Sequence, residues 1–310
     1  MTMGPNIDVS IVLAVYNEAG HLTDEIDRIK KAMDETDYRY EIIVVDDGST
    51  DGSGDRLREV EGIRLLQFGQ NRGAGSARKY GTLAAQGRIV VWTDVDMTYP
   101  NDSIPELVTQ MEGWDQVVGA RMSEQGTLKL LRRPAKWFVR KLAEYLTTTK
   151  IPDLNSGYRA FRRDVADQFL HLLPKGFSCV TTLTMAFLAN GYSVRFVPIS
   201  YYPRTGASKF HWWRDTKRYL SQVVRMAMMW EPMRLFGPPA AGIGIVGVGK
   251  LAYDMFSKDL RIATNTLVLL GVSIGIGLLG LLADLLVQLN KRKHNVLPST
   301  VQTDRSDSAF

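Results

Sequence analysis

Short apolar runs separated by helix-patterned segments dominate the N-terminal part of the chain. Runs typical of buried strands occur at residues 9–15, 40–45, 63–68, 89–93 and 116–118. After the first run, Leu22, Ile26, Ile29 and Met33 recur at helical spacing, which predicts a helix that covers the sheet. Strands that alternate with helices and with turns rich in Asp, Gly and Ser are typical of a doubly wound sheet. We therefore predict an α/β fold with a mostly parallel sheet.

The pattern changes near residue 211. From there to residue 232, apolar and aromatic residues recur every three or four positions with basic residues between them. This pattern is typical of an amphipathic helix at a membrane interface, although a helix that covers a domain can share it. Residues 262–283 then form an uncharged run long enough for a membrane span. An earlier run from Leu235 is interrupted by Lys250, so whether residues 235–253 cross the bilayer stays open.

These patterns divide the chain into four parts. We predict a globular domain at residues 1–210, an interfacial amphipathic helix at 211–232, two transmembrane helices at 233–290, and a basic and then disordered tail at 291–310. The basic residues 291–293 favour the cytoplasmic side, and two spans return the chain to the side that it left. The sequence thus predicts a multi-pass inner-membrane protein with a cytoplasmic globular domain. Glycines in the second span would also suit a homo-oligomer.

Composition narrows the class of partner. The chain has 38 Lys and Arg against 33 Asp and Glu, but the basic residues cluster with aromatic residues near the apolar end. That arrangement favours an anionic lipid membrane over nucleic acid. Cys179 is the only cysteine, so no intrachain disulfide can form, which fits a reducing cytosol.

Two carboxylates mark the most informative turn. Asp94 and Asp96 follow the apolar run at residues 89–93. Hard carboxylate oxygens at the end of a strand suit a divalent cation that would hold a diphosphate, although solvated turn aspartates give the same pattern. In doubly wound sheets ligands bind at the carboxyl ends of strands. We therefore expect residues 16–18, 46–51 and 94–96 to converge on one crevice.

Four motifs, taken in their order along the chain, resemble a known family. They are Val-Tyr-Asn-Glu at residues 15–18, Val-Asp-Asp-Gly-Ser-Thr-Asp at 45–51, Gly-Ala-Gly at 73–75 and Asp-Val-Asp at 94–96. Together they resemble family 2 glycosyltransferases of the GT-A fold, in particular the polyprenyl-phosphate sugar synthases. The resemblance implies inverting transfer of one hexose from a nucleotide diphosphate sugar to polyprenyl phosphate at the cytoplasmic membrane face.

The resemblance also implies roles for individual residues. Asp94 and Asp96 would bind Mg²⁺ or Mn²⁺, and Asp46 would contact the base, although an Asp before Gly and Ser also caps turns. The remaining residues that would border the nucleotide are Ala14, Tyr16, Glu18 and Val95. The dolichyl-phosphate mannose synthases tend to carry a glutamine metal ligand where this chain has Thr98. That departure favours a UDP-hexose over GDP-mannose.

Further candidates lie after residue 120. Arg121 would approach phosphate, with a surface salt bridge as the alternative. Asp153 begins an Asp-Leu-Asn-Ser-Gly-Tyr-Arg motif and would orient the acceptor or the sugar hydroxyls; a helix cap with a salt-bridged Arg159 is the competing interpretation. A loop that resembles the family's Arg-x-x-Gly-x-Ser-Lys would clamp phosphates as a mobile lid, or be an ordinary cationic loop. Its charged and polar residues are Arg204, Ser208 and Lys209.

Two other functions are compatible with this family. A processive glycan synthase would need the Gln-x-x-Arg-Trp acceptor motif, which is absent from the sequence. A membrane scaffold that only binds nucleotide sugar would not need Asp96, Asp153 and Arg204, to which the resemblance assigns the catalytic roles. We therefore expect a metal-dependent hexosyltransferase.

Overall fold

The computed structural model describes residues 7–121, 137, 140–176, 178–202, 221, 223–257 and 262–291. The chain divides into two compact units, one made of Met1–Tyr219 with Val296–Phe310 and one of Leu220–Asn295. The predicted loop with Arg204, Ser208 and Lys209 lies outside the described residues, as do half of the predicted amphipathic helix and nearly all of the tail.

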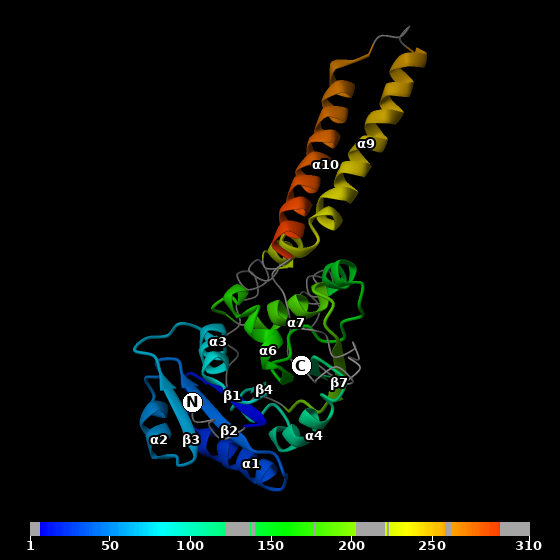
Figure 1. Cartoon of the computed structure of the whole chain (residues 1–310). Helices are drawn as coiled ribbons and strands as arrows, with labels where there is room; N and C mark the ends of the chain where they lie inside the picture. The colour runs from blue at the N-terminus through cyan, green and yellow to red at the C-terminus, as the bar shows by residue number, and fades with distance from the viewer. Residues whose placement is uncertain are drawn as a thin grey trace, which may run out of the picture. The chain divides into compact units, whose positions relative to one another are not determined.

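The first unit is built on one sheet (Figure 1). Its seven described strands are arranged in the order β3-β2-β1-β4-β6-β5-β7. The strands are β1 (Val9–Val15), β2 (Tyr40–Asp46), β3 (Ile63–Gln67), β4 (Ile89–Thr93), β5 (Gln116–Arg121), β6 (Arg159–Arg162) and β7 (Val194–Ile199). Only β6 runs antiparallel to its neighbours, β4 and β5. The prediction of a mostly parallel α/β sheet is confirmed.

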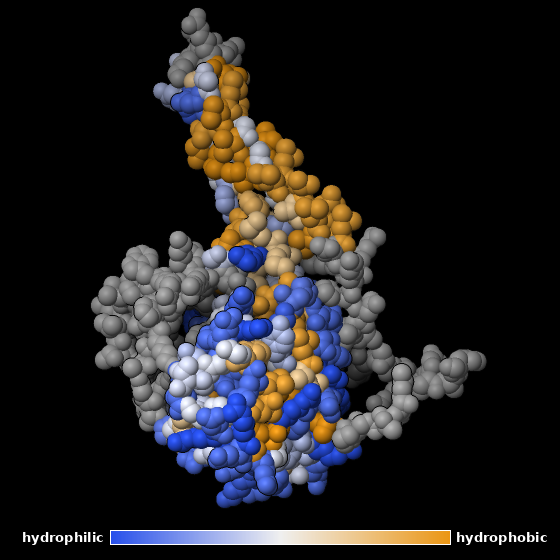
Figure 2. Space-filling view, turned by 90° about the vertical axis from the view of Figure 1, so that its left-hand side faces the viewer, coloured by the Kyte–Doolittle hydropathy of each residue, from blue (hydrophilic) through white to orange (hydrophobic). Residues whose placement is uncertain are grey.

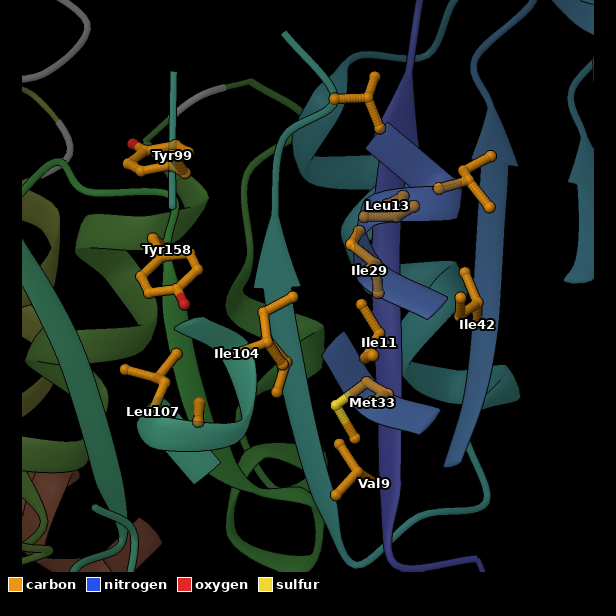
Figure 3. Close-up of a cluster of buried hydrophobic side chains, with 14 of the residues drawn as sticks. Val9, Ile11, Leu13, Ile29, Met33, Ile42, Tyr99, Ile104, Leu107 and Tyr158 are labelled. Carbon is orange, nitrogen blue, oxygen red and sulfur yellow. The ribbon is translucent and has the colours of Figure 1, made fainter. Parts of the chain in front are cut away.

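Helices cover both faces of the sheet. The described helices of this unit are α1 (Leu22–Asp34), α2 (Ser53–Glu59), α3 (Ala74–Ala84), α4 (Ile104–Thr109), α6 (Arg163–Asp167) and α7 (Cys179–Ala189), with 3-10 turns η1 (Asn101–Ser103) and η2 (Leu170–Leu172). Ile29 and Met33 of α1 lie against Ile11 of β1, and all three are fully buried (Figure 3). Burying an apolar side chain of this size stabilises the folded state by roughly 1.5–3 kcal/mol.

The opposite face of β1 packs against α3. A Cβ on Gly81 would lie 2.4 Å from Val12 Cγ1, so glycine is needed for this close approach. β1 is therefore covered on both faces, as its largely apolar run predicts.

The second unit is a helical hairpin (Figure 1). It consists of α9 (Pro232–Ser257) and α10 (Thr264–Lys291), both long and apolar enough to cross a membrane. At about 1.5 Å per residue, either helix exceeds the thickness of roughly 30 Å of a bilayer core. The helix α9 contains Pro238 and Pro239 in its first part and continues through Lys250.

Polar contacts join the two helices of the hairpin. Ser273 Oγ donates to the carbonyl of Ala240 at 2.7 Å. Near the turn, buried Asp254 accepts from Thr266 Oγ1 at 2.5 Å and lies 3.8 Å from the amine of Lys250. Lys250 therefore has an ionic partner one helical turn away, which explains how a charged residue is accommodated in this apolar helix. The outward side chains are mostly apolar (Figure 2).

Gln116 is an unusual core residue of the first unit. It is fully buried on β5, and neither its amide nitrogen nor its amide oxygen has a hydrogen-bond partner among the described residues. A buried polar group without a partner costs about 1–3 kcal/mol. Methionine has nearly the same shape and carries no such cost.

We predict that Gln116→Met stabilises the protein by about 1–2 kcal/mol, because it removes the unpaired amide. For a unit of this size the melting temperature should rise by roughly 2–6 °C. Thermal melting of the purified full-length protein in detergent measures the change. Gln86→Met, at an exposed position, is the matched control and should leave the melting temperature unchanged. A fall in the melting temperature of Gln116→Met would contradict the prediction.

Candidate functional site

The loops after β1 and β2 interlock at the carboxyl edge of the sheet. Val15 of β1 is in register with Asp46 of β2. Asn17 adopts a left-handed conformation, donates from its backbone to Ser49 Oγ at 3.0 Å, and accepts from the backbone of Thr50 at 2.8 Å. The predicted convergence of residues 16–18 and 46–51 is therefore present.

Asp46 is held by the protein itself. Its Oδ1 accepts from the backbone N–H of Ser49 at 2.9 Å, and its Oδ2 accepts from Gln67 Nε2 at 3.2 Å. These bonds show the turn-capping role; contact with a base stays a prediction. The neighbouring Asp47 is buried and accepts from the backbone N–H groups of Arg72 and Gly73, which makes it structural. Burial raises the pKa of Asp47.

The glycines at the start of α3 serve backbone packing. The N–H of Gly75 donates to the carbonyl of Lys175 at 2.8 Å. Gly73 has a φ of 93°, and a Cβ on it would lie 2.3 Å from the same carbonyl oxygen. The amino end of α3 is thus closed by another segment of the chain. These contacts favour a helix start as the role of Gly-Ala-Gly at residues 73–75, and not a cradle for phosphate.

Asp94 forms a buried ion pair with Arg78 of α3. Arg78 Nη2 donates to Asp94 Oδ1 at 2.6 Å, and the guanidinium lies 5.7 Å from the ring centroid of Trp92. The Arg78 side chain is 2% exposed, whereas that of Asp94 is 32% exposed. Asp94 therefore neutralises a buried cation through one oxygen.

Asp96 is fixed by its own turn. Thr98 Oγ1 donates to Asp96 Oδ1 at 2.5 Å, and Met97 between them has a φ of 61°. A positive φ is uncommon for a residue with a side chain and marks a constrained turn. Because the Thr98 hydroxyl hydrogen-bonds to Asp96, the residue orients the second carboxylate. An effect of Thr98 on a bound metal would therefore be exerted through Asp96.

Arg121 and Asp153 face each other across the site. Arg121 Nε donates to Asp153 Oδ2 at 2.6 Å and Nη2 donates to Oδ1 at 3.0 Å. The side chains are only 14% and 10% exposed, so the salt bridge is mostly buried and not superficial. Burial acts to raise the pKa of Asp153, but the bonds and charge of Arg121 outweigh it and hold that pKa below its usual value. Asp153 is accordingly ionised at neutral pH.

Arg159, the last residue of the Asp153 motif, has a structural role. It is fully buried and donates to the carbonyl of Val180 at 2.6 Å and to Thr184 Oγ1 at 2.8 Å, and it also contacts the carbonyl of Ser156. These bonds tie β6 to α7. Burial and then the charge of Arg78 lower the pKa of Arg159 to about 10. The proposed salt bridge of Arg159 is replaced by these uncharged acceptors.

Several residues that the sequence did not single out complete the site. Tyr201 lies 5.2 Å from the Arg121 guanidinium, and the hydroxyl of Tyr99 accepts from the N–H of Gly157 at 2.8 Å. Asn101 donates to the carbonyl of Asp94 at 3.0 Å. The sequence feature that could have identified Asn101 is its position directly after Tyr-Pro, because such a segment forms a turn beside the two carboxylates.

The carboxylates fit a divalent cation that has further ligands from a substrate. Among the described residues, no group of three or more His, Cys, Asp or Glu side chains is arranged to hold a metal. Mg²⁺ is commonly bound by one or two carboxylates together with substrate phosphates and water. Asp94, which uses one oxygen for Arg78, and Asp96 supply that kind of donor set.

Comparisons with known proteins agree with this architecture. Residues 10–170 match the sequence model of glycosyl transferase family 2, and residues 231–289 match that of the GtrB C-terminal hairpin. An undecaprenyl-phosphate 4-deoxy-4-formamido-L-arabinose transferase from Aeromonas hydrophila is 31% identical over 252 residues, which cover 76% of this chain and 73% of the relative. A dolichyl-phosphate hexose transferase from Haloferax volcanii is 31% identical over 210 residues, which cover 65% of this chain and 86% of the relative.

A solved structure also has this fold. It is glucosyl-3-phosphoglycerate synthase from Mycobacterium tuberculosis in complex with Mn²⁺, uridine diphosphate and glucosyl-3-phosphoglycerate. The TM-score is 0.55 at 23% sequence identity, and the match covers 72% of this chain and 79% of that chain. The predicted GT-A fold is confirmed.

The ion pair of Asp94 predicts an effect on stability. Asp94→Ala leaves the buried Arg78 without its carboxylate, and breaking a buried pair in this way costs about 3–5 kcal/mol. The double variant Asp94→Ala with Arg78→Met removes both charges and should recover most of that loss. Thermal melting of the wild type, the two single variants and the double variant measures the coupling between the residues. A single Asp94→Ala variant that melts like the wild type would refute this account.

Proposed function

The chain belongs to glycosyl transferase family 2, and we propose that it transfers a single hexose from a nucleotide diphosphate sugar to polyprenyl phosphate with inversion at the anomeric carbon. The observation that carries the proposal is that Asp94 and Asp96 follow the carboxyl end of β4 and Arg121, paired with Asp153, ends β5, at the same edge of the sheet because both strands run antiparallel to β6. Residues 231–289 of the same chain match the GtrB C-terminal hairpin. The resemblance to the prenyl-phosphate sugar transferases, predicted from the motifs, is confirmed by the family match and the relatives.

The donor would lie along the carboxyl edge of β1, β2 and β4. Asp94 and Asp96 would hold Mg²⁺ or Mn²⁺, which when bound neutralises charge on the leaving diphosphate. Asp46 would accept from the base. Ala14, Tyr16, Glu18 and Val95 would border the nucleotide, and Arg204, Ser208 and Lys209 would supply further donors to its phosphates.

The reaction needs little acid–base chemistry from the protein. A phosphate oxygen of the acceptor is anionic at neutral pH and attacks without first losing a proton. Asp153, ionised and bound to Arg121, would therefore orient Arg121 and the sugar hydroxyls. Arg121 lies beside Tyr201, and its planar guanidinium suits a phosphate oxygen.

The donor is proposed to be a UDP-hexose, with GDP-mannose as the second candidate. The support is Thr98, which stands where the mannose synthases tend to have a glutamine. Its hydroxyl donates to Asp96. The related solved structure contains uridine diphosphate and Mn²⁺, which is compatible with this choice.

The hairpin indicates a membrane-associated protein. We propose that α9 and α10 both span the inner membrane and that the globular domain predicted at residues 1–210 lies on its cytoplasmic side. The interfacial helix at 211–232 and the basic residues at 291–293 would contact anionic lipid on that side. A homo-oligomer through the hairpin is part of the same proposal.

We expect Asp96→Ala to abolish transfer while the protein stays folded, because Asp96 is a proposed ligand of the metal that would neutralise charge on the leaving diphosphate. Purified protein is incubated with Mn²⁺, radiolabelled UDP-glucose or GDP-mannose, and undecaprenyl phosphate. Lipid-linked monosaccharide is the expected product. Asp55→Ala, at an exposed carboxylate on α2, is the control and should retain full activity.

Other products of this incubation would overturn the proposal. Polymer would indicate a processive synthase, and nucleotide-sugar binding without product would indicate a scaffold. Full activity in Asp96→Ala would contradict its role as a metal ligand. A thermal-shift screen of nucleotide sugars with Mn²⁺ then identifies the donor, since a ligand that binds the folded state raises the melting temperature.

A further inference from the structure

We propose that Glu25 of α1 is a positioning residue for the donor site, which it controls through Asn101. This inference rests on the proposed function, because it concerns the aspartate turn that would bind the cation and the diphosphate. The side chains that hydrogen-bond to Glu25 are Arg28 and Asn101, and neither Asp94 nor Asp96 is among its partners in the described part of the chain. It acts on the turn that carries them through one intervening side chain.

Glu25 is a fully buried carboxylate in an otherwise apolar helix face. It lies among Leu22, Ile26 and Ile29, which pack α1 against the sheet. Packing alone does not require a charge there, and burying a carboxylate is costly unless it is paired and hydrogen-bonded. Its partners are Arg28 at 3.2 Å and the side-chain amide of Asn101.

Asn101 connects this carboxylate to the aspartate turn. It is fully buried in η1, and its Oδ1 accepts from Thr93 Oγ1 at 2.5 Å. Its Nδ2 donates both to Glu25 and to the backbone carbonyl of Asp94, the latter at 3.0 Å. Both the oxygen and the nitrogen of the Asn101 amide are thus hydrogen-bonded. This one side chain holds Thr93, the last residue of β4, and Asp94, the residue after it.

The carboxylate of Glu25 determines the orientation of the Asn101 amide. An ionised carboxylate accepts hydrogen bonds and donates none, so Glu25 selects the orientation of the Asn101 amide in which Nδ2 faces it. The reverse orientation would place the amide oxygen against the carbonyl of Asp94, where two acceptors repel. With the amide fixed, the peptide of Asp94 is fixed as well.

Arg28 makes the arrangement rigid. Its guanidinium bonds to Glu25 and also to Asp102 at 2.6 Å, and Asp102 directly follows Asn101. The arginine therefore clamps η1 to α1 on the outer side of Asn101. A network in which every member has a partner specifies one conformation of the turn.

A matched control exists at the other end of the sheet. Asp115 is also a fully buried carboxylate, paired with Arg162 at 3.0 Å and bonded to Ser193 Oγ at 2.9 Å. It immediately precedes the amino end of β5, whereas the donor loops lie at the carboxyl ends of the strands. Asp115→Asn changes a buried carboxylate to an amide in the same way as Glu25→Gln, without touching Asn101.

The test is Mn²⁺ binding by the full-length protein in detergent, measured by electron paramagnetic resonance of free Mn²⁺ with UDP or with GDP present. Glu25→Gln places a donor against the Asn101 amide or Arg28, and should weaken Mn²⁺ binding by about 10–100-fold, as is usual when a residue that orients a metal ligand is changed. Asp115→Asn should bind Mn²⁺ like the wild type even where its melting temperature falls. The apparent KM for Mn²⁺ in transfer should rise by the same factor in Glu25→Gln only.

The outcomes separate this inference from the proposed function. A wild-type protein that binds no Mn²⁺ with either nucleotide refutes the donor site itself. Normal Mn²⁺ binding by Glu25→Gln refutes the positioning role, and so does equal weakening in Glu25→Gln and Asp115→Asn. If Glu25→Gln does not fold, Thr93→Val removes only the hydroxyl bond to Asn101 and should weaken Mn²⁺ binding in the same direction. Unchanged binding in Thr93→Val would then overturn the inference.

Discussion

The parallel pairing of β1 with both β2 and β4 is the constraint on which the site depends. Val15 is in register with Asp46, and Leu13 with Thr93, so the residues after all three strands emerge at one edge. The face of β1 that packs on α3 is specific, because Gly81 of α3 leaves room only for the close approach of Val12, and a slip of one residue would turn Val12 to the opposite face. Loops that are far apart in sequence are thereby brought together before any ligand binds.

Charge at this edge is balanced within the protein. Asp94 is paired with Arg78 and Asp153 with Arg121, in both cases with low exposure of at least one partner. An unpaired buried charge would be costly, so each carboxylate and its arginine depend on one another. The consequence for function is that the two proposed metal ligands differ. Asp94 contributes to the fold through Arg78, whereas Asp96 is held locally by Thr98.

The sequence predicted the parts that depend on local pattern. The runs at β1, β2 and β4 and the helical spacing of α1 are visible because burial imposes a period on neighbouring residues. β6 and β7 were not predicted; β6 is only four residues long and its pairing with β4 and β5 is antiparallel. The arginine partners were also missed, since Arg121 and Asp153 are 32 residues apart and only tertiary structure brings them together. The hydrogen bond from Thr98 to Asp96 was not predicted either, because it has no signature in sequence.

The hairpin shows how polar residues can be retained in an apolar pair of helices. Asp254, Lys250, Thr266 and Ser273 all have partners within the hairpin. In hydrocarbon such groups cannot be satisfied by water, so bonds between the helices replace hydration and hold α9 and α10 in one register. Gly247 permits the close approach, because a Cβ there would lie 2.9 Å from Leu270 Cδ2. The interruption of the first apolar run at Lys250 therefore reflects how the hairpin is fastened near its turn, and the helix α9 continues through it.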